Sequence, residues 1–498
     1  MSSSPPPCEA RQLILPKLLH TSTPHLSSLL YDPKSSSLAF RHFDSSFSVY
    51  PCVNLLNISS FPSPQTLIPS PTSSATFLHL QTSPESTTTI FLTCSPVVRP
   101  SSSTLLRFYL LRDDRFGKIK VLSSHRDLEW DQGKGGMLFK TNHGISMKLS
   151  GGINVFSLYS VSNSKIWVFA VRLIGDHDGA QALKLMKCAL IDCCFPIFEI
   201  KVLFGFLILG EENGVRVFPL RPLVKGRQRK EKKSVGKRLN LHSGSSNGGK
   251  TLATDGELNL LSVKGEKSER HNDSAKLRFT KLRQDSKDTG GVFVAFEDKD
   301  FNGSVSVKMP GKSVKAISVE ALSANKFVIL DSIGNLHVLC LSSSLHGLDT
   351  GCVMRQSTQT MKVLKMAVFH DVSAVTRTVW MSDGCYTVHL MAVSGVDASV
   401  DESEVEDTDE KLVKTSVTQA ILTSEKIHDI VPMDANAILI LGQVSPGDHV
   451  LGAISSSHAK NSTVFQMKYK VSVLGTPKFF LRLLFDWVHA PLFCLQRI

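Results

Sequence analysis

A short phrase recurs along this chain: a run of apolar residues, a tight turn, then a strand in which apolar and polar residues alternate. The clearest copy runs from Phe327 to Leu330, turns through residues 331–335 and resumes at Leu336. Other copies are centred near residues 45, 94, 151, 213, 383 and 443. Hairpins that repeat with turn residues between them favour a radial or stacked β-architecture.

The spacing of these hairpins indicates a repeating unit of about 55 residues. Successive centres are 49, 57, 62, 120, 50 and 60 residues apart, and leaving out residues 225–290 (66 residues) shortens the long interval to 54. Four-stranded blades with some loop expansion fit this unit, and seven of them would close a ring without free sheet edges. We therefore predict an all-β fold: a β-propeller of about seven four-stranded blades.

In period and hairpin rhythm the chain resembles the WD-repeat β-propellers. It departs from them in two respects, since we recognise neither a Gly-His start nor a Trp-Asp strand ending. The resemblance is one of layout, so it transfers no functional residue to this sequence. It implies a rigid ring whose loops present binding surface to other proteins.

Four regions follow along the chain. Residues 1–224 are assigned to about four N-terminal blades, 225–290 to a basic insert, 291–474 to about three C-terminal blades, and 475–498 to an apolar tail. The insert holds 17 Lys and Arg against 8 Asp and Glu, so its surplus of nine supplies most of the net charge of +12. Its few apolar residues predict disorder.

Clustered cations open this insert and suggest a role for it. They are Lys225, Arg227, Arg229, Lys230, Lys232, Lys233, Lys237 and Arg238. Such a run suits the acidic groove of an importin or the phosphates of a nucleic acid, both of which need charge density rather than a fixed fold. We expect import into the nucleus. Contact with RNA, and a merely soluble linker, are the alternatives.

A second charged stretch has the opposite sign. Residues 397–410 contain eight acids, which predicts a solvated loop. Ser403 and Thr408 lie next to acids and are candidate sites for acid-directed kinases.

Residues 244–251 match the phosphate-binding pattern G-x4-G-K-[ST], with Lys250 and Thr251 in the positions that contact phosphate and Mg²⁺. Asp331, at the end of an apolar run, is a candidate metal carboxylate. However, no apolar strand precedes Gly244 and no amphipathic helix follows Thr251. A nucleotide hydrolase therefore stays an alternative, and we predict that the protein is not an enzyme.

No cysteine or histidine spacing typical of a zinc site occurs, and no catalytic set with supporting context. We expect no cofactor, metal, small-molecule substrate or membrane span. Strand histidines such as His337 and His389 are interpreted as outward-facing alternates. The start of the chain does not read as a secretory signal, while its Ser-rich, acid-poor composition leaves an organellar transit peptide open.

The tail contains a stretch, Phe479–Trp487, that is apolar nearly all round. It could dock as a helix in a partner's groove, pack across its own propeller, or lie apart from the folded unit. Together these features predict a non-catalytic protein-interaction scaffold of a nuclear multi-protein complex. An RNA- or ribosome-assembly factor that uses the basic insert is the first alternative.

Overall fold

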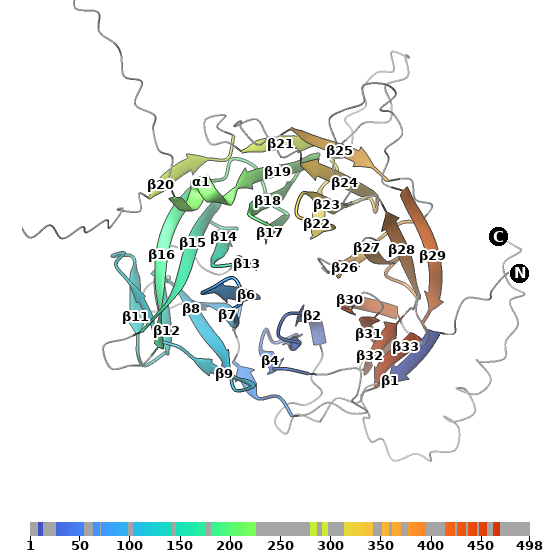
Figure 1. Ribbon diagram of the computed structural model, residues 1–498, viewed down its shortest axis with the longest axis horizontal. Coiled ribbons are helices and arrows are strands. Elements are labelled where there is room, and N and C mark those ends of the chain that lie inside the picture. The colour runs from blue at the N-terminus through green and yellow to red at the C-terminus, as the bar shows by residue number, and fades with distance from the viewer. Residues whose placement is uncertain are drawn as a thin grey trace, which may run out of the picture.

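The computed structural model is a ring of mainly antiparallel sheets around a common axis (Figure 1). It describes residues 8–12, 26–53, 63–69, 71–97, 103–141, 146–175, 181–225, 279–285, 291–296, 313–341, 351–357, 361–369, 377–394, 414–423, 426–434, 437–445, 448–455 and 462–468. These residues contribute strands to seven sheets. The predicted all-β propeller is confirmed.

The first three sheets come from the N-terminal part of the chain. Sheet 1 contains β2 (Leu26–Asp32), β3 (Ser37–His42), β4 (Phe47–Tyr50) and β5 (Thr66–Ile68). Sheet 2 contains β6 (Ser74–Gln81), β7 (Thr87–Val97), β8 (Ser103–Arg112), β12 (Gly136–Lys140) and β11 (Leu128–Asp131), with β9 (Arg115–Lys118) also paired to β8. Sheet 3 contains β13 (Met147–Gly151), β14 (Val155–Ser160), β15 (Lys165–Gly175) and β16 (Gln181–Asp192), with β10 (Val121–Ser123) and β20 (Thr280–Arg283) both paired to β16.

Four further sheets complete the ring. Sheet 4 contains β17 (Glu199–Leu203), β18 (Phe206–Glu211), β19 (Gly214–Pro219) and β21 (Val292–Ala295). Sheet 5 contains β22 (Ala316–Ala321), β23 (Lys326–Asp331), β24 (Leu336–Leu341) and β25 (Cys352–Gln356). Sheet 6 contains β26 (Lys365–Val368), β27 (Arg377–Ser382), β28 (Thr387–Ser394) and β29 (Lys414–Leu422). Sheet 7 contains β30 (Lys426–Asp434), β31 (Ala437–Ser445), β32 (Asp448–Ser455), β33 (Ser462–Lys468) and, from the start of the chain, β1 (Cys8–Gln12).

Each sheet is buried on both sides, which explains the continuous apolar runs in the sequence. In β23, Val328 and Leu330 pack in the hydrophobic cluster shared with sheet 6. The alternate residues Phe327 and Ile329 pack in the cluster shared with sheet 4. Because successive side chains of a strand point to opposite faces, one apolar run serves two junctions.

A hydrophobic cluster lies at each junction between neighbouring sheets, including the junction that closes the ring. There Leu26 and Phe40 of sheet 1 pack with Leu439 and Leu441 of sheet 7. In addition, β1 pairs with β33 and β32, so the two ends of the propeller chain share one sheet. The ring is therefore closed by side-chain packing and by backbone hydrogen bonds.

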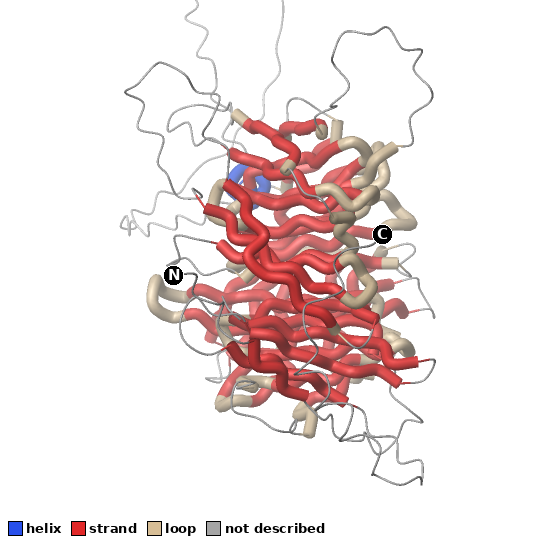
Figure 2. The backbone as a smooth tube through the Cα atoms, turned by 90° about the vertical axis from the view of Figure 1, so that its right-hand side faces the viewer, coloured by secondary structure: helices blue, strands red, loops and turns tan. Residues whose placement is uncertain are grey.

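Strands run across the thickness of the ring, so their connections lie on its two faces (Figure 2). The first strand of each sheet is nearest the axis (Figure 1). We call the face that carries the turns between second and third strands, and the connections from one sheet to the next, the top face. The bottom face carries the turns between first and second strands and the connections from the third strand to the outer strands.

The hairpins predicted near residues 45, 213, 333 and 383 are those between the second and third strands of sheets 1, 4, 5 and 6. The turns predicted near residues 94 and 443 are misplaced, because β7 continues to Val97 and β31 to Ser445 before the chain turns into β8 and β32. The turn near residue 151 exists, but it joins the first and second strands of sheet 3.

The basic insert interrupts sheet 4 between its third and outermost strands. At its start, α1 (Leu220–Lys225) buries Leu220 and Leu223 in the cluster between sheets 3 and 4. Before its end, β20 pairs in parallel with β16, where the residue composition predicts disorder. Residues 226–278 lie outside the described part of the chain. No helix among the described residues is both long and apolar enough to cross a membrane.

Candidate protein-interaction surface

Large apolar side chains are exposed preferentially on the top face. Of the fourteen large hydrophobic residues exposed in the described chain, seven lie at the top face: six in turns or connections, and one at the end of β29. They are Phe43, Val161, Phe195, Ile333, Leu364, Tyr386 and Leu422. Only Ile153 and Phe204 among the fourteen lie in bottom-face turns. The remainder lie in or beside strands.

Four of these residues form a contiguous patch on sheets 5 and 6, which we call the top-face patch: Ile333, Leu364, Tyr386 and Leu422. Their exposed fractions are 48%, 44%, 52% and 60%. Val363 donates its amide to the carbonyl of Gly334 at 3.0 Å, which joins the turn of Ile333 to the segment of Leu364. Thr423 donates its amide to the carbonyl of Tyr386 at 2.8 Å, which joins the turn of Tyr386 to the end of β29.

Local turn chemistry holds Tyr386 in this position. Cys385 donates its amide to Asp383 Oδ1 at 2.8 Å, and Gly384 has a φ of +71°, which is unfavourable for residues with a Cβ. A Cβ at Gly384 would approach Leu364 Cδ1 to 2.7 Å. The glycine therefore allows the turn of Tyr386 to lie directly on Leu364.

A carboxylate fixes the turn that presents Ile333. Asp331 Oδ1 accepts the amides of Ile333, Gly334 and Asn335 at 2.9, 2.8 and 2.8 Å. Its Oδ2 accepts Asn335 Nδ2 at 3.0 Å and contacts His337 Nε2 at 2.9 Å. The side chain of Ile333 is thereby directed to solvent while the turn beneath it is rigid.

Hydrogen bonding overrides burial at Asp331. Burial alone would raise the pKa of its carboxyl group, but hydrogen bonds from His337, Asn335 and Gly334 lower that pKa to about 2. Its oxygens are occupied by the turn and by His337, so the carboxylate is structural. The interpretation of His337 as outward-facing is wrong: its ring is buried and stacks on Phe296 with centroids 4.1 Å apart.

Paired charges lie on the strands around the axis. Lys201 on β17 lies 2.9 Å from Glu320 Oε1 on β22 and 3.9 Å from Glu199 Oε1 on its own strand. Burial raises the pKa of Glu199, whereas the two carboxylates outweigh burial and raise the pKa of Lys201. Since Lys201 is paired with both carboxylates, we assign these charges to stability. In the described chain no group of three or more His, Cys, Asp and Glu side chains could hold a metal ion.

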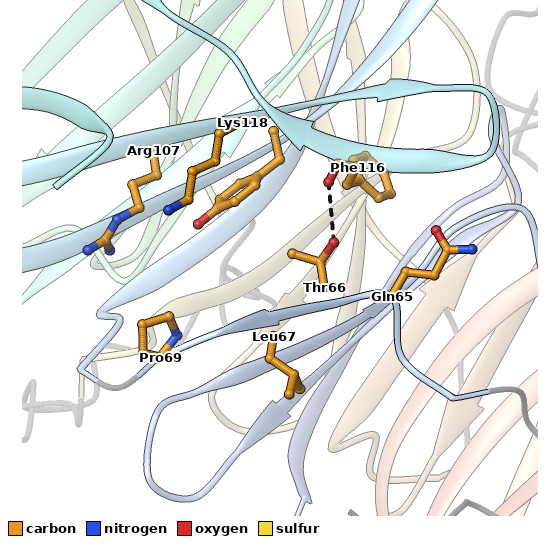
Figure 3. Close-up of a pocket in the computed structure, with 8 residues that line it drawn as sticks. Gln65, Thr66, Leu67, Pro69, Arg107, Phe116 and Lys118 are labelled. Atoms are coloured by element: carbon orange, nitrogen blue, oxygen red, sulfur yellow. Dashed lines mark hydrogen bonds between the residues drawn. The ribbon is translucent and has the colours of Figure 1, made fainter. Parts of the chain in front are cut away.

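A cavity of about 350 Å³ lies on the circumference of the ring between sheets 1 and 2 (Figure 3). Gln65, Thr66, Leu67 and Pro69 line one wall, and Arg107, Tyr109, Phe116 and Lys118 line the other. Thr66 Oγ1 donates to the Phe116 carbonyl across it at 3.4 Å. With two cations and no acid in its lining, the cavity could receive a carboxylate or phosphate.

Most site residues predicted from sequence lie outside the described chain. Lys225 is the exposed last residue of α1, whereas the seven cations from Arg227 to Arg238 fall within residues 226–278. The phosphate-loop match at 244–251 lies outside as well, as do Ser403 and Thr408. The structure therefore brings none of these predicted residues together.

Sequence reasoning missed the top-face patch, although a signal for it exists. Phe43, Ile333 and Tyr386 are large apolar residues inside tight turns, where small polar residues and glycine are usual. The dipeptide Trp130-Asp131 was missed too. It ends β11, and WD repeats end a strand with the same pair.

Comparison with known proteins gives structural likeness only. No protein-family model matches the chain, and no curated protein sequence matches it. Among solved structures, it is similar to the β-propeller domain of Cps50 (Swd1) from Myceliophteria thermophila, with 6% identity over 87% of this chain and 97% of that one and a TM-score of 0.42.

Two further solved structures are similarly distant. The WD40 domain of SCAP from fission yeast has 8% identity over 92% of this chain and 90% of its own, with a TM-score of 0.41. Sqt1 from Chaetomium thermophilum has 10% identity over 91% and 86%, with a TM-score of 0.40. The seven sheets of this chain, arranged around one axis, confirm the predicted propeller layout. Function has to be argued from this chain's own surface.

Proposed function

We propose that the protein is a non-catalytic scaffold that binds a protein partner through the top-face patch. The observation that carries the proposal is the concentration of exposed large apolar side chains on one face of a closed ring. Contiguous exposed apolar surface on a folded protein marks an interaction site. The residue types also fit, because aromatic and large aliphatic anchors dominate the binding energy of protein interfaces.

Rigidity supports the same proposal. The turns that carry Ile333 and Tyr386 are fixed by Asp331 and Asp383, and both are hydrogen-bonded to the connection beside them. Side chains held in place before binding lose little conformational entropy when a partner docks. The preformed top-face patch therefore favours stable binding of a protein partner.

The test compares a top-face variant with a bottom-face variant. In one, Leu364, Tyr386 and Leu422 become serine; in the other, Ile153 and Phe204 of the bottom face become serine. Proteins captured from native cells are identified for each variant and for the unaltered chain. We expect at least one partner to be retained by the bottom-face variant and reduced about tenfold or more by the top-face variant. An identical partner set in all three samples would contradict the proposal.

Action in the nucleus is a separate proposal, supported by the cations from Lys225 to Arg238. Since Leu223 is buried, deletion of the whole run would damage α1. The test therefore replaces Arg227, Arg229, Lys230, Lys232 and Lys233 by alanine in a fluorescent fusion. We expect loss of nuclear accumulation; an unchanged distribution would refute import through this run.

RNA binding is the second candidate, favoured by the surplus of nine positive charges in residues 225–290. Affinity that rests on phosphate contacts falls steeply with added salt. The same five-alanine variant would then lose RNA binding and most of the salt dependence. Equal RNA affinity of the variant and the unaltered chain would exclude this role for the run.

A further inference from the structure

The chain leaves the propeller on the face that carries the apolar patch. β33 runs antiparallel to β32, and Lys468 at its end lies opposite Val450, just after the turn between β31 and β32. That turn joins the second and third strands of sheet 7 and so belongs to the top face. The described chain therefore ends at the top face, next to sheet 6, and the predicted apolar tail at 475–498 lies outside the described residues.

This terminal segment contains the apolar stretch Phe479–Trp487, in which seven of nine residues are Phe, Leu or Trp. Its two charges, Arg482 and Asp486, are four residues apart and would lie one turn apart in a helix. The ten residues from 469 to 478 span up to about 33 Å when extended. The stretch can therefore reach the neighbouring sheets 5 and 6, where the top-face patch lies.

We propose that residues 479–487 of the same chain cover the top-face patch. Two apolar surfaces would otherwise both face water, and their mutual burial removes that cost. A short tether gives the second surface an effective concentration in the millimolar range, so even weak intrinsic affinity holds it in place. The length of the tether and its starting point favour this segment over an unconnected partner.

The proposal adds regulation to the proposed function, since a partner that binds the patch must first displace the tail. It depends on the same patch but not on any partner, and its test uses the isolated protein. Failure of the test would therefore leave partner binding open, and failure to find a partner would leave tail docking open.

Exposed cysteines provide the readout. Cys385 lies beside Tyr386 in the patch, Cys194 lies on the top face at the far side of the ring, and Cys52 lies on the bottom face. The alkylation rate of each thiol by a maleimide is followed by mass spectrometry of its peptide in the full chain. A second full-length protein carries Leu483→Glu and Leu484→Glu, and a control carries Gln496→Glu outside the apolar stretch.

We expect Cys385 to react about tenfold faster in the double variant, as follows if the tail covers the patch nine-tenths of the time. Cys194 and Cys52 should react equally in all three proteins, which shows that the ring is intact. Equal Cys385 rates in all three would overturn the proposal. A Cys385 rate that rises on dilution of the unaltered protein would also overturn it, because the covering segment would then belong to a second copy.

Discussion

At the scale of single residues, buried polar side chains hold the turns between second and third strands. Asp331 binds its turn and His337; Glu211 pairs with Arg216 of the next strand through hydrogen bonds of 2.7 and 3.2 Å. His42 Nε2 lies 2.7 Å from Ser48 Oγ in the same position of sheet 1. The residue that ends the second strand thus anchors the start of the third.

Removal of the Asp331 carboxylate should weaken the protein. Asp331→Ala leaves three turn amides and His337 without their acceptor, and we expect the free energy of unfolding to fall by roughly 2–4 kcal/mol. Urea unfolding measures the change. Unfolding of the variant at the same urea concentration as the unaltered chain would contradict this structural role.

The same group gives a pH dependence of defined sign. Its pKa falls from 3.8 to about 2 on folding, so the charged form is favoured in the folded state. The stabilisation is complete above about pH 4 and is lost as the pH falls toward 2; it amounts to about 2 kcal/mol. When the pH falls from 4 toward 2, the Asp331→Asn variant should lose about 2 kcal/mol less stability than the unaltered protein, because it lacks this carboxyl group. If the free energy of unfolding depended on pH in the same way in both proteins, the lowered pKa of Asp331 would be ruled out as the cause.

Gly151 permits close approach of two inner strands. A Cβ there would lie 2.1 Å from the backbone oxygen of Phe77 on sheet 2. Gly151→Ala should therefore lower the thermal midpoint strongly, by the equivalent of about 3 kcal/mol or more. Gly117→Ala is the matched control, because a Cβ added at Gly117 would have no atom within 4 Å. Equal midpoints for both variants would show that the strands separate freely.

At the scale of secondary-structure elements, the anchoring of β20 is the feature that local sequence least suggests. Residues 279–285 read as part of a polar, basic segment, yet β20 extends sheet 3 and Gln284 is fully buried. Gln284 Oε1 accepts the amides of Cys194 and Phe195 at 2.8 and 2.9 Å. These hydrogen bonds join residues about ninety positions apart, so the local pattern of apolar and polar residues cannot predict them.

Gln284→Ala should release β20 from sheet 3. Two amides would lose their acceptor, at a cost of roughly 1–3 kcal/mol. Hydrogen exchange of the amides in β20 should become faster, while exchange in β23 should not change. Lys281→Ala is the control, because that side chain is exposed and its ion pair with Asp192 lies at the surface. Unchanged exchange in the Gln284 variant would show that the strand pairing alone anchors β20.

Sequence patterns found those hairpins in which an apolar run meets turn residues directly. The turns after Glu211, Asp331 and Ser382 are of this kind. The turn predicted near residue 94 falls inside β7, in which Pro96 lies close to the strand end and pairs with Thr104. Gly151 was interpreted as a turn residue, whereas packing against Phe77 requires a glycine there.

At the scale of the whole molecule, the ring is a cycle of seven sheet junctions, each with its own hydrophobic cluster. A cluster between sheets 7 and 1 means that no sheet forms an open end. The fold class follows from the repeat of hairpins in the sequence. The top-face patch does not, because its four residues come together only when sheets 5 and 6 are placed side by side.

Damage at the closing junction should therefore affect the whole ring. Leu439→Ala empties part of the buried cluster between sheets 7 and 1 and should cost about 2–5 kcal/mol. Leu67→Ala, at a side chain 61% exposed, should cost less than about 0.5 kcal/mol. Signals from Trp380 in sheet 6 and Trp167 in sheet 3 should shift together. Early loss of the Trp380 signal alone would mean that the sheets unfold independently.

The position of the basic insert within sheet 4 bears on how the protein responds to proteases. β19 and β21 are hydrogen-bonded neighbours, although residues 220–291 separate them along the chain. A single cut between residues 226 and 278 would divide the polypeptide into two fragments, but the folded ring would stay assembled. The two fragments would remain joined by the β19–β21 ladder, by β20 on sheet 3 and by β1 on sheet 7, and would part only in denaturant.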